Sequence, residues 1–481
     1  MWQPVLMISG YFISVLGLAM LFPAAVDIYY SNHDWSPFIT SAIISLFIGL
    51  SLFLGNRTKI DKISIRQGYL LTTISWLSLS LLASLPFMLS GTTYNWADAI
   101  FEATSGITTT GGTILTDIDN TSKAVLLWRS LLNGLGGVGI VIFAVALLPF
   151  LGIGGMQIFQ RENSDLNDKL MPKISYIAKR IIIIYGILVI LTFIGLILAG
   201  MGRFDAINHA LSAVSTGGFS TKTASVGYFN SLSIELVLIA GMIAGSLPLT
   251  YYLVLLQRRD SHSFRTVQVP FFLKTLAFYI LFTTVWLTFN DTEYNFWSAL
   301  RVSAFNIVSI TTDCGFASTD YMKWGAFAQT IFIIFALTGG CTGSTAGGIK
   351  IFRWQVIFAF LKKAFINLTE PNRVLPVKIK DLTVSNEIIS SVFIFVTSFG
   401  FSIVVLTVLL AITGLDFTTA FSAVIGCITN DGPGVGKIVG PAGSFAPLSD
   451  FAKYVCSFAM LLGRLEVLTV LVVFTRNFWH K

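Results

Sequence analysis

Four short glycine-centred segments, at residues 108–112, 215–218, 312–316 and 429–433, constrain this chain more than any other feature of its sequence. Each follows a short half-apolar stretch and lies between two long apolar runs, which indicates a fourfold internal repeat. The backbone can adopt φ > 0 at the first glycine of each segment, so consecutive carbonyl oxygens can point at one axis and replace the hydration shell of a cation. These glycines are Gly111, Gly217, Gly315 and Gly432.

The composition is typical of a membrane protein. Of 481 residues, 54% are hydrophobic and 11% are charged, whereas soluble globular chains carry about 25% charged residues. Ten apolar runs are candidates for crossing the hydrocarbon core, which takes ~20 residues. They are 5–30, 38–55, 69–90, 124–149, 177–200, 231–256, 268–290, 326–358, 386–412 and 450–475. The first run is not a cleavable signal peptide, because it is long, lacks a basic start and is followed by further spans.

The charges predict the orientation. Loops after the even-numbered runs, from Arg57 to Arg476, hold most of the basic residues, and the opposite loops hold few, among them Lys123. The positive-inside rule therefore places both termini in the cytoplasm and all four glycine segments on the outer side. Acidic residues such as Asp98 and Asp205 favour the outer loops. They form either a negative mouth that concentrates cations or an ordinary solvated surface.

We predict an all-α polytopic membrane protein with ten transmembrane helices and four re-entrant pore helices around a fourfold pseudo-symmetric pore. An N-terminal transmembrane hairpin at 1–56 precedes four pore repeats at 57–150, 151–257, 258–365 and 366–481. The short helices are expected at 95–106, 204–213, 295–310 and 416–427, where Asn95, Asp205, Asn295 and Asp416 can cap them. They are too short to cross, and re-entrant backbone survives at membrane depth only where protein buries it or it lines water.

The residues around the four glycines are the candidate cation ligands. They are Thr109, Thr110, Gly111, Ser215, Thr216, Gly217, Asp313, Cys314, Gly315, Asn430, Asp431 and Gly432. A single loop of this kind is usually an ordinary turn. Four of them in matching positions of four matching repeats favour a selectivity filter.

The eighth apolar run, 326–358, is too long for one span. At 1.5 Å per residue it would make a helix of roughly 50 Å, against a hydrocarbon core of ~30 Å. It should break at 339–348, where glycines are frequent and each costs ~1 kcal/mol relative to alanine in a helix. A phosphate-binding loop would end in Gly-Lys-Ser/Thr, which Gly348-Ile349-Lys350 does not supply. The segment either lines a cavity below the filter or is a passive packing kink.

The chain resembles the membrane subunits of the Trk/Ktr potassium-transporter superfamily, the TrkH/TrkG-like proteins of the bacterial Trk uptake system. The resemblance runs from the first span to the C-terminus. It is carried by Thr-Thr-Thr-Gly at 108–111, Gly-Gly-Phe-Ser-Thr at 217–221, Gly-Gly-Cys-Thr-Gly-Ser-Thr-Ala-Gly-Gly at 339–348, Asn430 with Gly-Pro-Gly at 432–434, and Gly-Arg-Leu-Glu-Val at 463–467.

This resemblance implies K⁺ uptake across the bacterial inner membrane, with one filter glycine per repeat. It also implies a homodimer and a separate TrkA-like cytosolic nucleotide-binding subunit, which would dock on the basic inner loops. We expect no cofactor in this chain, K⁺ as the transported ion, membrane lipid as the surroundings and no nucleic-acid partner.

The resemblance further implies that 339–348 gates the pore and that Arg464 lies on the permeation path below the filter. The candidate gate residues are Gly339, Gly340, Cys341, Thr342, Gly343, Ser344, Thr345, Gly347, Gly348, Lys350 and Arg464. A basic residue at this depth normally faces a cavity or a partner, so Arg464 is either a barrier to cations or half of a structural ion pair. Arg129 lies nearer the outer end of its span, where we expect its side chain to snorkel.

Two positions depart from the family pattern. Asp313 stands where small neutral residues are usual, and Asp431 stands where an apolar residue is common. Both aspartates either point behind the filter and accept hydrogen bonds, or face the pore and change the K⁺/Na⁺ ratio.

Other classes of function find less support. Cys314, Cys341, Cys427 and Cys456 have no metal-ligand or disulfide spacing, and no catalytic constellation indicates an enzyme. The dinucleotide fingerprint at 134–139 lies inside a span, where close helix packing explains it better. A Na⁺-conducting or Na⁺/K⁺-symporting relative is the nearer alternative, although related transporters that favour Na⁺ have serine where this chain has Gly111. A small-solute secondary transporter is more distant, since its repeats usually form two inverted halves.

Overall fold

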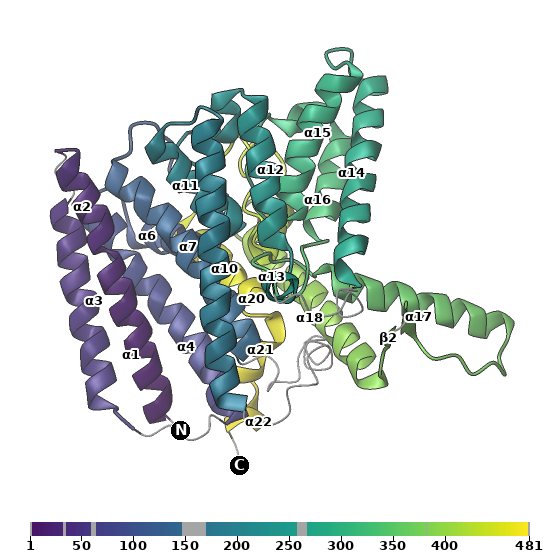
Figure 1. Cartoon of the computed structure of the whole chain (residues 1–481), viewed down its shortest axis with the longest axis horizontal. Coiled ribbons are helices and arrows are strands. Elements are labelled where there is room, and N and C mark those ends of the chain that lie inside the picture. The colour runs from purple at the N-terminus through teal and green to yellow at the C-terminus, as the bar shows by residue number, and fades with distance from the viewer. Residues whose placement is uncertain are drawn as a thin grey trace.

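A computed structural model describes residues 2–31, 35–58, 64–146, 170–256, 267–380 and 382–479. In these ranges the chain is mostly helical, with one antiparallel hairpin of β1 (Lys378–Ile379) and β2 (Leu382–Thr383). The long helices form one bundle, and α1 (Trp2–Ala19) begins at the end of the bundle where α22 (Arg476–Trp479) lies (Figure 1). There the rings of Trp2 and Trp479 stack with centroids 6.2 Å apart. The predicted all-α polytopic class is confirmed.

Seven segments are long and apolar enough to cross a membrane without a sharp break. They are α1 with α2 (Leu21–Tyr29), α3 (Trp35–Gly55), α4 (Ile65–Ala83) with α5 (Leu85–Leu89), α7 (Lys123–Ala146), α10 (Leu170–Leu198), α14 (Gln268–Asn290) and α18 (Asn386–Ala411). They match seven of the ten predicted runs, although residues 147–149 of the fourth run lie outside the described part of the chain.

The other three predicted runs are broken. A bend of 90° separates α12 (Leu232–Ser246) from α13 (Leu249–Leu256), and one of 111° separates α20 (Asp450–Arg464) from α21 (Val467–Val473). The non-helical residues 337–350, here called the glycine segment, separate α16 (Ala326–Ala336) from α17 (Ile351–Thr369). Only the last break was predicted, so the expectation of continuous helices at 231–256 and 450–475 is wrong. The described residues contain seven unbroken spans, or nine if each bent pair counts as one.

The break after α12 has a local cause and a tertiary complement. Pro248 has no N–H and disfavours a helical residue before it, and Leu247 is extended with ψ 152°. The backbone groups released by the break are satisfied by the glycine segment, since Cys341 N–H donates to Ser246 O (3.0 Å) and Leu249 N–H donates to Gly343 O (3.1 Å). Two broken spans therefore complete each other's hydrogen bonding at membrane depth.

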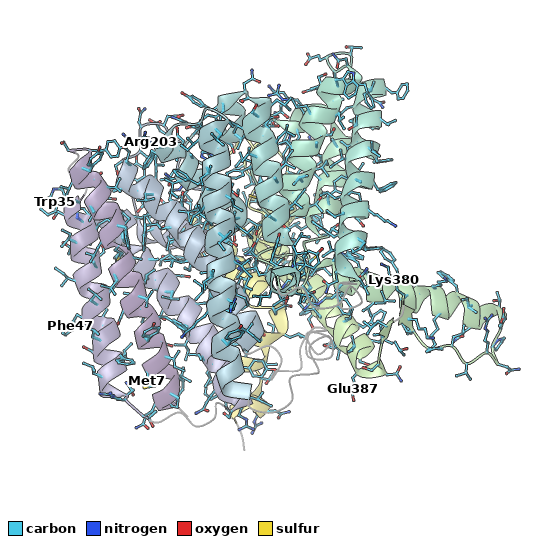
Figure 2. All side chains as sticks on the ribbon, in the orientation of Figure 1. Met7, Trp35, Phe47, Arg203, Lys380 and Glu387 are labelled. Carbon is cyan, nitrogen blue, oxygen red and sulfur yellow. The ribbon has the colours of Figure 1, made fainter. Side chains whose placement is uncertain are left out.

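Large apolar side chains cover the outer faces of the bundle. Phe47 on α3 is 74% exposed and points away from the molecule (Figure 2), and Phe289 on α14 is 84% exposed. Many Ser, Thr and Asn side chains, Thr104 and Asn306 among them, are instead completely buried. This inverted distribution is expected of a chain whose surroundings are lipid tails.

The first two spans form a tight hairpin through small residues. A Cβ atom added to Gly10 on α1 would lie 2.6 Å from the carbonyl oxygen of Gly49 on α3, so the two backbones approach closely, as in small-residue membrane packing. The division into a hairpin and four repeats stays a prediction. Its boundaries near residues 150 and 257 fall outside the described ranges.

Candidate functional site

Four short helices precede the four glycine-centred loops. They are α6 (Trp96–Ile107), α11 (Arg203–Val214), α15 (Phe296–Thr311) and α19 (Phe417–Thr429). Three begin with the predicted cap. Asn95 accepts from Asp98 N–H, Asn295 from Trp297 and Ser298 N–H, and Asp416 from Thr419 N–H. These side chains satisfy backbone donors that a helix N-terminus leaves free.

The cap predicted for the second short helix is wrong. The residue before α11 is Gly202, and Asp205 lies inside the first turn. The Asp205 carboxylate instead accepts a hydrogen bond from Thr221 Oγ1 (2.6 Å), and its backbone oxygen lies 2.8 Å from His209 Nδ1. Asp205 therefore ties α11 to the chain that follows the second loop.

One recurring hydrogen bond sets the register of the four loops. In each, the N–H of the residue just before a glycine donates to the carbonyl oxygen five residues earlier, in the last turn of the short helix. The pairs are Thr110 to Ser105 (2.8 Å), Gly217 to Ser212 (2.8 Å), Cys314 to Ser309 (2.8 Å) and Asp431 to Gly426 (3.0 Å). Thr110, Gly217, Cys314 and Asp431 are therefore equivalent.

Positive φ angles flank that equivalent residue in every loop. The residues before it are Thr109 (54°), Thr216 (53°), Asp313 (57°) and Asn430 (63°), and those after it are Gly111 (82°), Gly218 (66°), Gly315 (84°) and Gly432 (92°). Left- and right-handed conformations thus alternate, which turns successive carbonyl oxygens toward the same side. Non-glycine residues rarely adopt φ > 0, and such strain clusters at functional sites.

The register predicted for the second loop is wrong by one residue. The glycine with positive φ there is Gly218, while Gly217 occupies the position of Thr110, Cys314 and Asp431. The side chain of Asn133 from α7 fills the space that a Cβ on Gly217 would need, at 2.5 Å. The prediction fails because either of two adjacent glycines fits the local pattern, and a neighbouring helix decides between them.

The four loops close into one ring. A Cβ atom added to Gly111 would lie 2.5 Å from the carbonyl oxygen of Gly217 in the next loop. Equivalent contacts join Gly218 to the Cys314 carbonyl, Gly315 to the Asp431 carbonyl and Gly432 to the Thr110 carbonyl. Each loop touches the next in chain order and the fourth touches the first, so all four surround a single axis.

Glycines on the following spans let these helices pack against the ends of the short helices. A Cβ on Gly136, Gly245 or Gly463 would collide with a carbonyl oxygen in the last turn of α6, α11 or α19. Gly136 lies within the 134–139 sequence, which forms part of the helix α7. The close-packing interpretation of that sequence is therefore confirmed.

The glycine segment lies against the side of the ring where the short helices end. Thr345 donates from N–H to Gly245 O (3.2 Å) and from Oγ1 to Val214 O (3.0 Å). Gly348 N–H donates to Thr429 O (2.9 Å). The predicted break in the eighth run is confirmed, and the segment contacts structure around the second and fourth loops directly.

Arg464 is buried beside this segment. It ends α20, is 4% exposed, and donates from Nη1 to Thr345 O (2.7 Å) and from Nη2 to Gly136 O (3.5 Å). Among the described residues it makes no ion pair within 4.0 Å. The structural-pair alternative for Arg464 therefore has no direct partner in this part of the chain, and Arg464 instead joins the first repeat to the glycine segment.

Lys350 and Glu466 belong to a separate ion-pair cluster. Glu466 Oε1 lies 3.0 Å from Lys350 Nζ, and Glu466 Oε2 lies 2.5 Å from Arg353 Nη2, with all three side chains almost completely buried. Glu466 (φ 63°) stands at the bend between α20 and α21, and Lys350 (φ 73°) precedes α17. This cluster fastens the bends of two broken spans to each other.

The two unusual aspartates occupy different environments. Asp313 is completely buried, and neither of its carboxylate oxygens accepts a hydrogen bond that meets standard geometry. A Cβ on Gly348 would lie 3.4 Å from Asp313 Oδ1, so this carboxylate faces the glycine segment. Its nearest positive charges belong to Arg464 and Lys350. Asp313 therefore lies beside the candidate gate rather than behind the ring.

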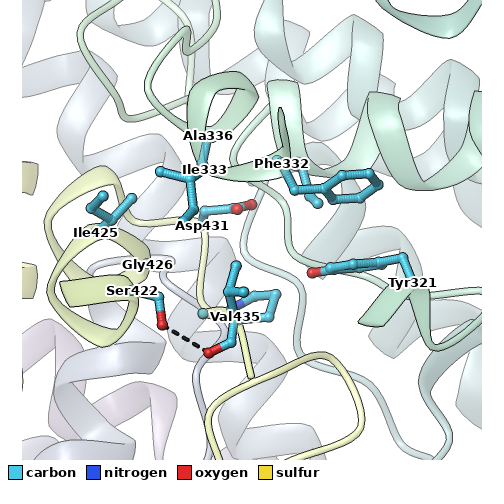
Figure 3. A pocket seen from close by; sticks show the side chains of 12 residues that line it. Tyr321, Phe332, Ile333, Ala336, Ser422, Ile425, Gly426, Asp431 and Val435 are labelled. Carbon is cyan, nitrogen blue, oxygen red and sulfur yellow. Dashed lines mark hydrogen bonds between the residues drawn. The ribbon is translucent and has the colours of Figure 1, made fainter. Parts of the chain in front are cut away.

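Asp431 points behind the ring into a cavity of about 10 Å³, room for about one water molecule. Its carboxylate lies between Ile333 of α16 and the rings of Phe332 and Tyr321 (Figure 3). Asp431 is 1% exposed, and its Oδ1 accepts no hydrogen bond from the described residues. Of the two predicted orientations, the one behind the filter is correct for Asp431, without the predicted hydrogen bond to Oδ1.

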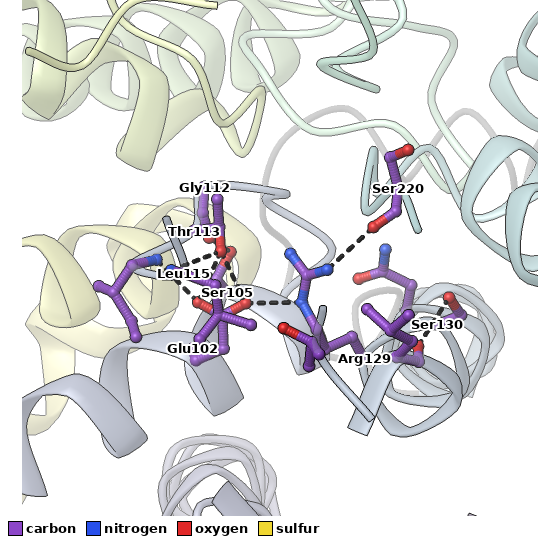
Figure 4. Close-up of polar contacts among 12 residues, drawn as sticks. Glu102, Ser105, Gly112, Thr113, Leu115, Arg129, Ser130 and Ser220 are labelled. Atoms are coloured by element: carbon purple, nitrogen blue, oxygen red, sulfur yellow. Dashed lines mark hydrogen bonds and ion pairs between the residues drawn. The ribbon is translucent and has the colours of Figure 1, made fainter. Parts of the chain in front are cut away.

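A buried ion pair that sequence reasoning missed supports the first loop. Glu102 Oε1 lies 2.7 Å from Arg129 Nε, and Glu102 Oε2 accepts from Ile114 N–H at 2.9 Å (Figure 4). Arg129 also donates to Ser220 O (2.9 Å), just after the second loop. Arg129 is 1% exposed, so the expectation that it snorkels is wrong. An acid on a short helix and a base within the next span were the available signal.

Further buried pairs join neighbouring repeats. Lys453 Nζ of α20 lies 2.5 Å from Asp98 Oδ1 of α6, and Arg301 Nε of α15 lies 2.8 Å from Glu235 Oε2 of α12. Asp98 is 6% exposed, so this acid contributes to packing between repeats and not to a negative outer mouth.

No arrangement for metal or redox chemistry is present in the described ranges. All four cysteines are free and buried, and no group of three or more His, Cys, Asp or Glu side chains could hold a metal ion.

A multispanning helical protein with four short helices and a closed ring of backbone loops has the architecture of a cation-transport protein. The TrkH cation transport protein family matches residues 35–481, and the chain belongs to this family. It is 38% identical to the Trk system potassium uptake protein TrkI of Halomonas elongata over 100% of this chain and 97% of that protein. It is 33% identical to TrkG of Escherichia coli K12, over 98% and 97%. The crystal structure of the potassium transporter TrkH from Vibrio parahaemolyticus superposes with a TM-score of 0.92 at 31% identity, covering 100% of both chains.

Proposed function

We propose that this protein takes up K⁺ across the bacterial inner membrane through the ring of four loops, with both termini in the cytoplasm. The single observation that carries the proposal is the closure of the ring, in which each loop glycine touches the carbonyl of the next loop. Relatives described as potassium uptake proteins align with this chain over nearly their whole length, which supports K⁺ as the ion.

In this proposal the carbonyl oxygens of the ring bind dehydrated K⁺. Alternating backbone handedness aims them at the axis, and close contact between neighbouring loops holds the ring at a constant diameter. Carbonyl dipoles can replace a hydration shell without trapping the ion, because a neutral ligand binds it less tightly than a charged one.

The glycine segment acts as the gate. It presses against Val214 and Thr429 at the ends of two short helices and faces Asp313 of the third loop, which supports a role as an obstruction on the inner side of the ring. Arg464 donates to Thr345 of the segment and so brings a positive charge to the same place. K⁺ passes when the segment and Arg464 move away together.

We further infer that the protein is a homodimer controlled by a TrkA-like cytosolic nucleotide-binding subunit. The designation of the relatives as parts of a Trk system supports a multi-subunit assembly. Two of the basic inner loops predicted to receive this subunit, near residues 147–169 and 257–266, lie outside the described residues.

Growth of a K⁺-uptake-deficient bacterial strain tests the function. Expression of this chain should restore growth at low K⁺, and excess Na⁺ should not suppress it. Gly218→Ser should abolish the rescue, whereas Cys314→Ser, a change of similar size one register position away, should retain it. Suppression by Na⁺ would favour the Na⁺-conducting alternative, and failure of rescue by well-expressed protein would contradict the proposal.

A further inference from the structure

A second cavity, of about 210 Å³, lies away from the ring at the base of α14. Its walls come from the start of α14, from the middle of α17 and from the β1–β2 hairpin. Three exposed lysines line it, Lys274, Lys378 and Lys380, and no acidic residue does. Phe271 and Phe358 supply apolar wall. The cavity thus combines concentrated positive charge with an apolar side, which is a combination suited to an anionic amphiphile.

The helix α17 has the position of an interfacial helix. It runs across the direction of α14 from the end of α14 where that helix begins, and projects from the bundle (Figure 1). Its side chains include Phe365 and Leu368, 67% and 78% exposed, as well as the exposed Lys362. Exposed apolar and basic residues on one such helix are typical of helices that lie in the headgroup region.

One buried polar atom at this cavity lacks a partner. Gln355 lines the cavity and is 6% exposed. Its Nε2 donates to Val267 O (3.1 Å), whereas its Oε1 accepts nothing from the described residues. An unpartnered buried acceptor is costly, and this one calls for a donor such as a hydroxyl group on whatever occupies the cavity.

We propose that this cavity binds the headgroup of an anionic glycerophospholipid that carries a free hydroxyl, such as phosphatidylglycerol. The phosphate lies among Lys274, Lys378 and Lys380, the headgroup hydroxyl donates to Gln355 Oε1, and the acyl chains follow the apolar surfaces of α14 and α17. Basic pockets beside cytoplasmic helix ends bind anionic headgroups in this way. The site is separate from the ring and requires only that the start of α14 faces the inner leaflet.

Native mass spectrometry of the full chain in detergent tests this site. With phosphatidylglycerol and phosphatidylcholine supplied together, the wild-type protein should retain mainly phosphatidylglycerol. The double substitution Lys378→Ala/Lys380→Ala should weaken this retention roughly 30-fold, which corresponds to about 1 kcal/mol per lysine. The matched control Lys362→Ala/Lys363→Ala removes the same charge from α17 outside the cavity and should change retention less than about threefold.

A filling variant separates the shape of the cavity from its charge. Ala359→Trp leaves all lysines in place and should also weaken retention of phosphatidylglycerol. Equal retention by the wild type and the Lys378→Ala/Lys380→Ala protein would overturn the proposal. Competition by excess inorganic phosphate would show a site for the phosphate group alone. A changed oligomeric state in Ala359→Trp with unchanged lipid retention would show that a second copy of the chain occupies the cavity. These readouts measure lipid mass and assembly, so they do not depend on K⁺ transport.

Discussion

Asp313 and Asp431 are the same kind of side chain on neighbouring loops, and they face different parts of the molecule. Asp313 is the residue with positive φ before the equivalent position and faces the glycine segment, beside Arg464. Asp431 is at the equivalent position itself and faces a closed cavity behind the ring. One residue of register, in a backbone whose handedness alternates, therefore decides whether an acid can act on the permeating ion or only on the packing of the loop.

The first and second loops show what the ring requires without acids. Their counterparts of Asp313 are Thr109 and Thr216, and those of Asp431 are Thr110 and Gly217. The side of Thr110 behind the ring is filled by hydrogen bonds to Thr108 and Asn430. Neutral side chains suffice to hold the backbone, so the two aspartates are additions to the common design and their effects can be tested separately.

The largest effect should come from the glycines of the ring. Gly218→Ser should lower the K⁺/Na⁺ flux ratio at least about tenfold, because a Cβ there collides with the Cys314 carbonyl and φ is 66°. Gly111→Ser should act similarly. Cys314→Ser, behind the ring, should change the ratio less than about twofold. Fluxes in proteoliposomes measure this, and an unchanged ratio in folded Gly218→Ser protein would remove Gly218 from the filter.

The next effect should separate the two aspartates. Asp313→Asn should reduce K⁺ flux about tenfold, because unit charges 4 Å apart interact by about 4 kcal/mol at an effective dielectric of 20 and the gap to a passing ion is larger. Asp431→Asn is the matched control and should alter flux less than about twofold. Equal losses in both variants would contradict the distinction between a residue that faces the gate and one behind the ring.

Arg464→Ala should raise K⁺ flux several-fold without the cytosolic subunit, since it removes both a positive charge and the hydrogen bond to Thr345 O. Arg464→Lys keeps the charge and should change flux much less. Because Arg464 and Asp313 interact electrostatically, the double variant Arg464→Ala/Asp313→Asn should depart from additivity. Additive effects, or a large loss of melting temperature with no gain in flux, would assign Arg464 a structural role.

A smaller effect, on stability alone, should follow Asp431→Leu. The side chain sits in a cavity walled largely by apolar groups, with Oδ1 unpartnered, and an apolar replacement of similar volume removes that penalty, about 1–3 kcal/mol. The melting temperature in detergent should rise by a few degrees while K⁺ flux stays within about twofold. A lower melting temperature would mean that the carboxylate has a stabilising partner.

The smallest effect concerns the exposed cap Asp416. The hydrogen bonds from Thr419 lower the pKa of this carboxyl below its ordinary 3.8. A lowered folded-state pKa contributes stability that is present at neutral pH and is lost as the pH falls below the ordinary value. Asp416→Asn retains a capping oxygen without the titration, so the wild type should lose slightly more melting temperature than this variant between about pH 5 and about pH 3. Parallel curves would show that the cap does not depend on charge.

Local patterns in the sequence were sufficient for several features. Apolar runs and few charges predict a multispanning helical protein because lipid requires long apolar helices. Asn95, Asn295 and Asp416 cap short helices as expected, since a cap depends on residues three positions apart. The glycines at 339–348 predict the broken eighth run, because several of them within ten residues cannot sustain a helix.

Tertiary structure decided the features that depend on atoms distant in the chain. Asn133 and the Cys314 carbonyl choose between Gly217 and Gly218, and no local rule distinguishes two adjacent glycines. The bends after Ser246 and Arg464 survive in the membrane because the glycine segment satisfies the freed backbone groups at the first and the cluster of Lys350, Arg353 and Glu466 secures the second. The sequence alone determined that four loops and a broken span exist, because those follow from local propensity and hydrophobicity. Their register, closure and the direction of each buried charge depend on packing and electrostatics between segments, which only the folded chain brings together.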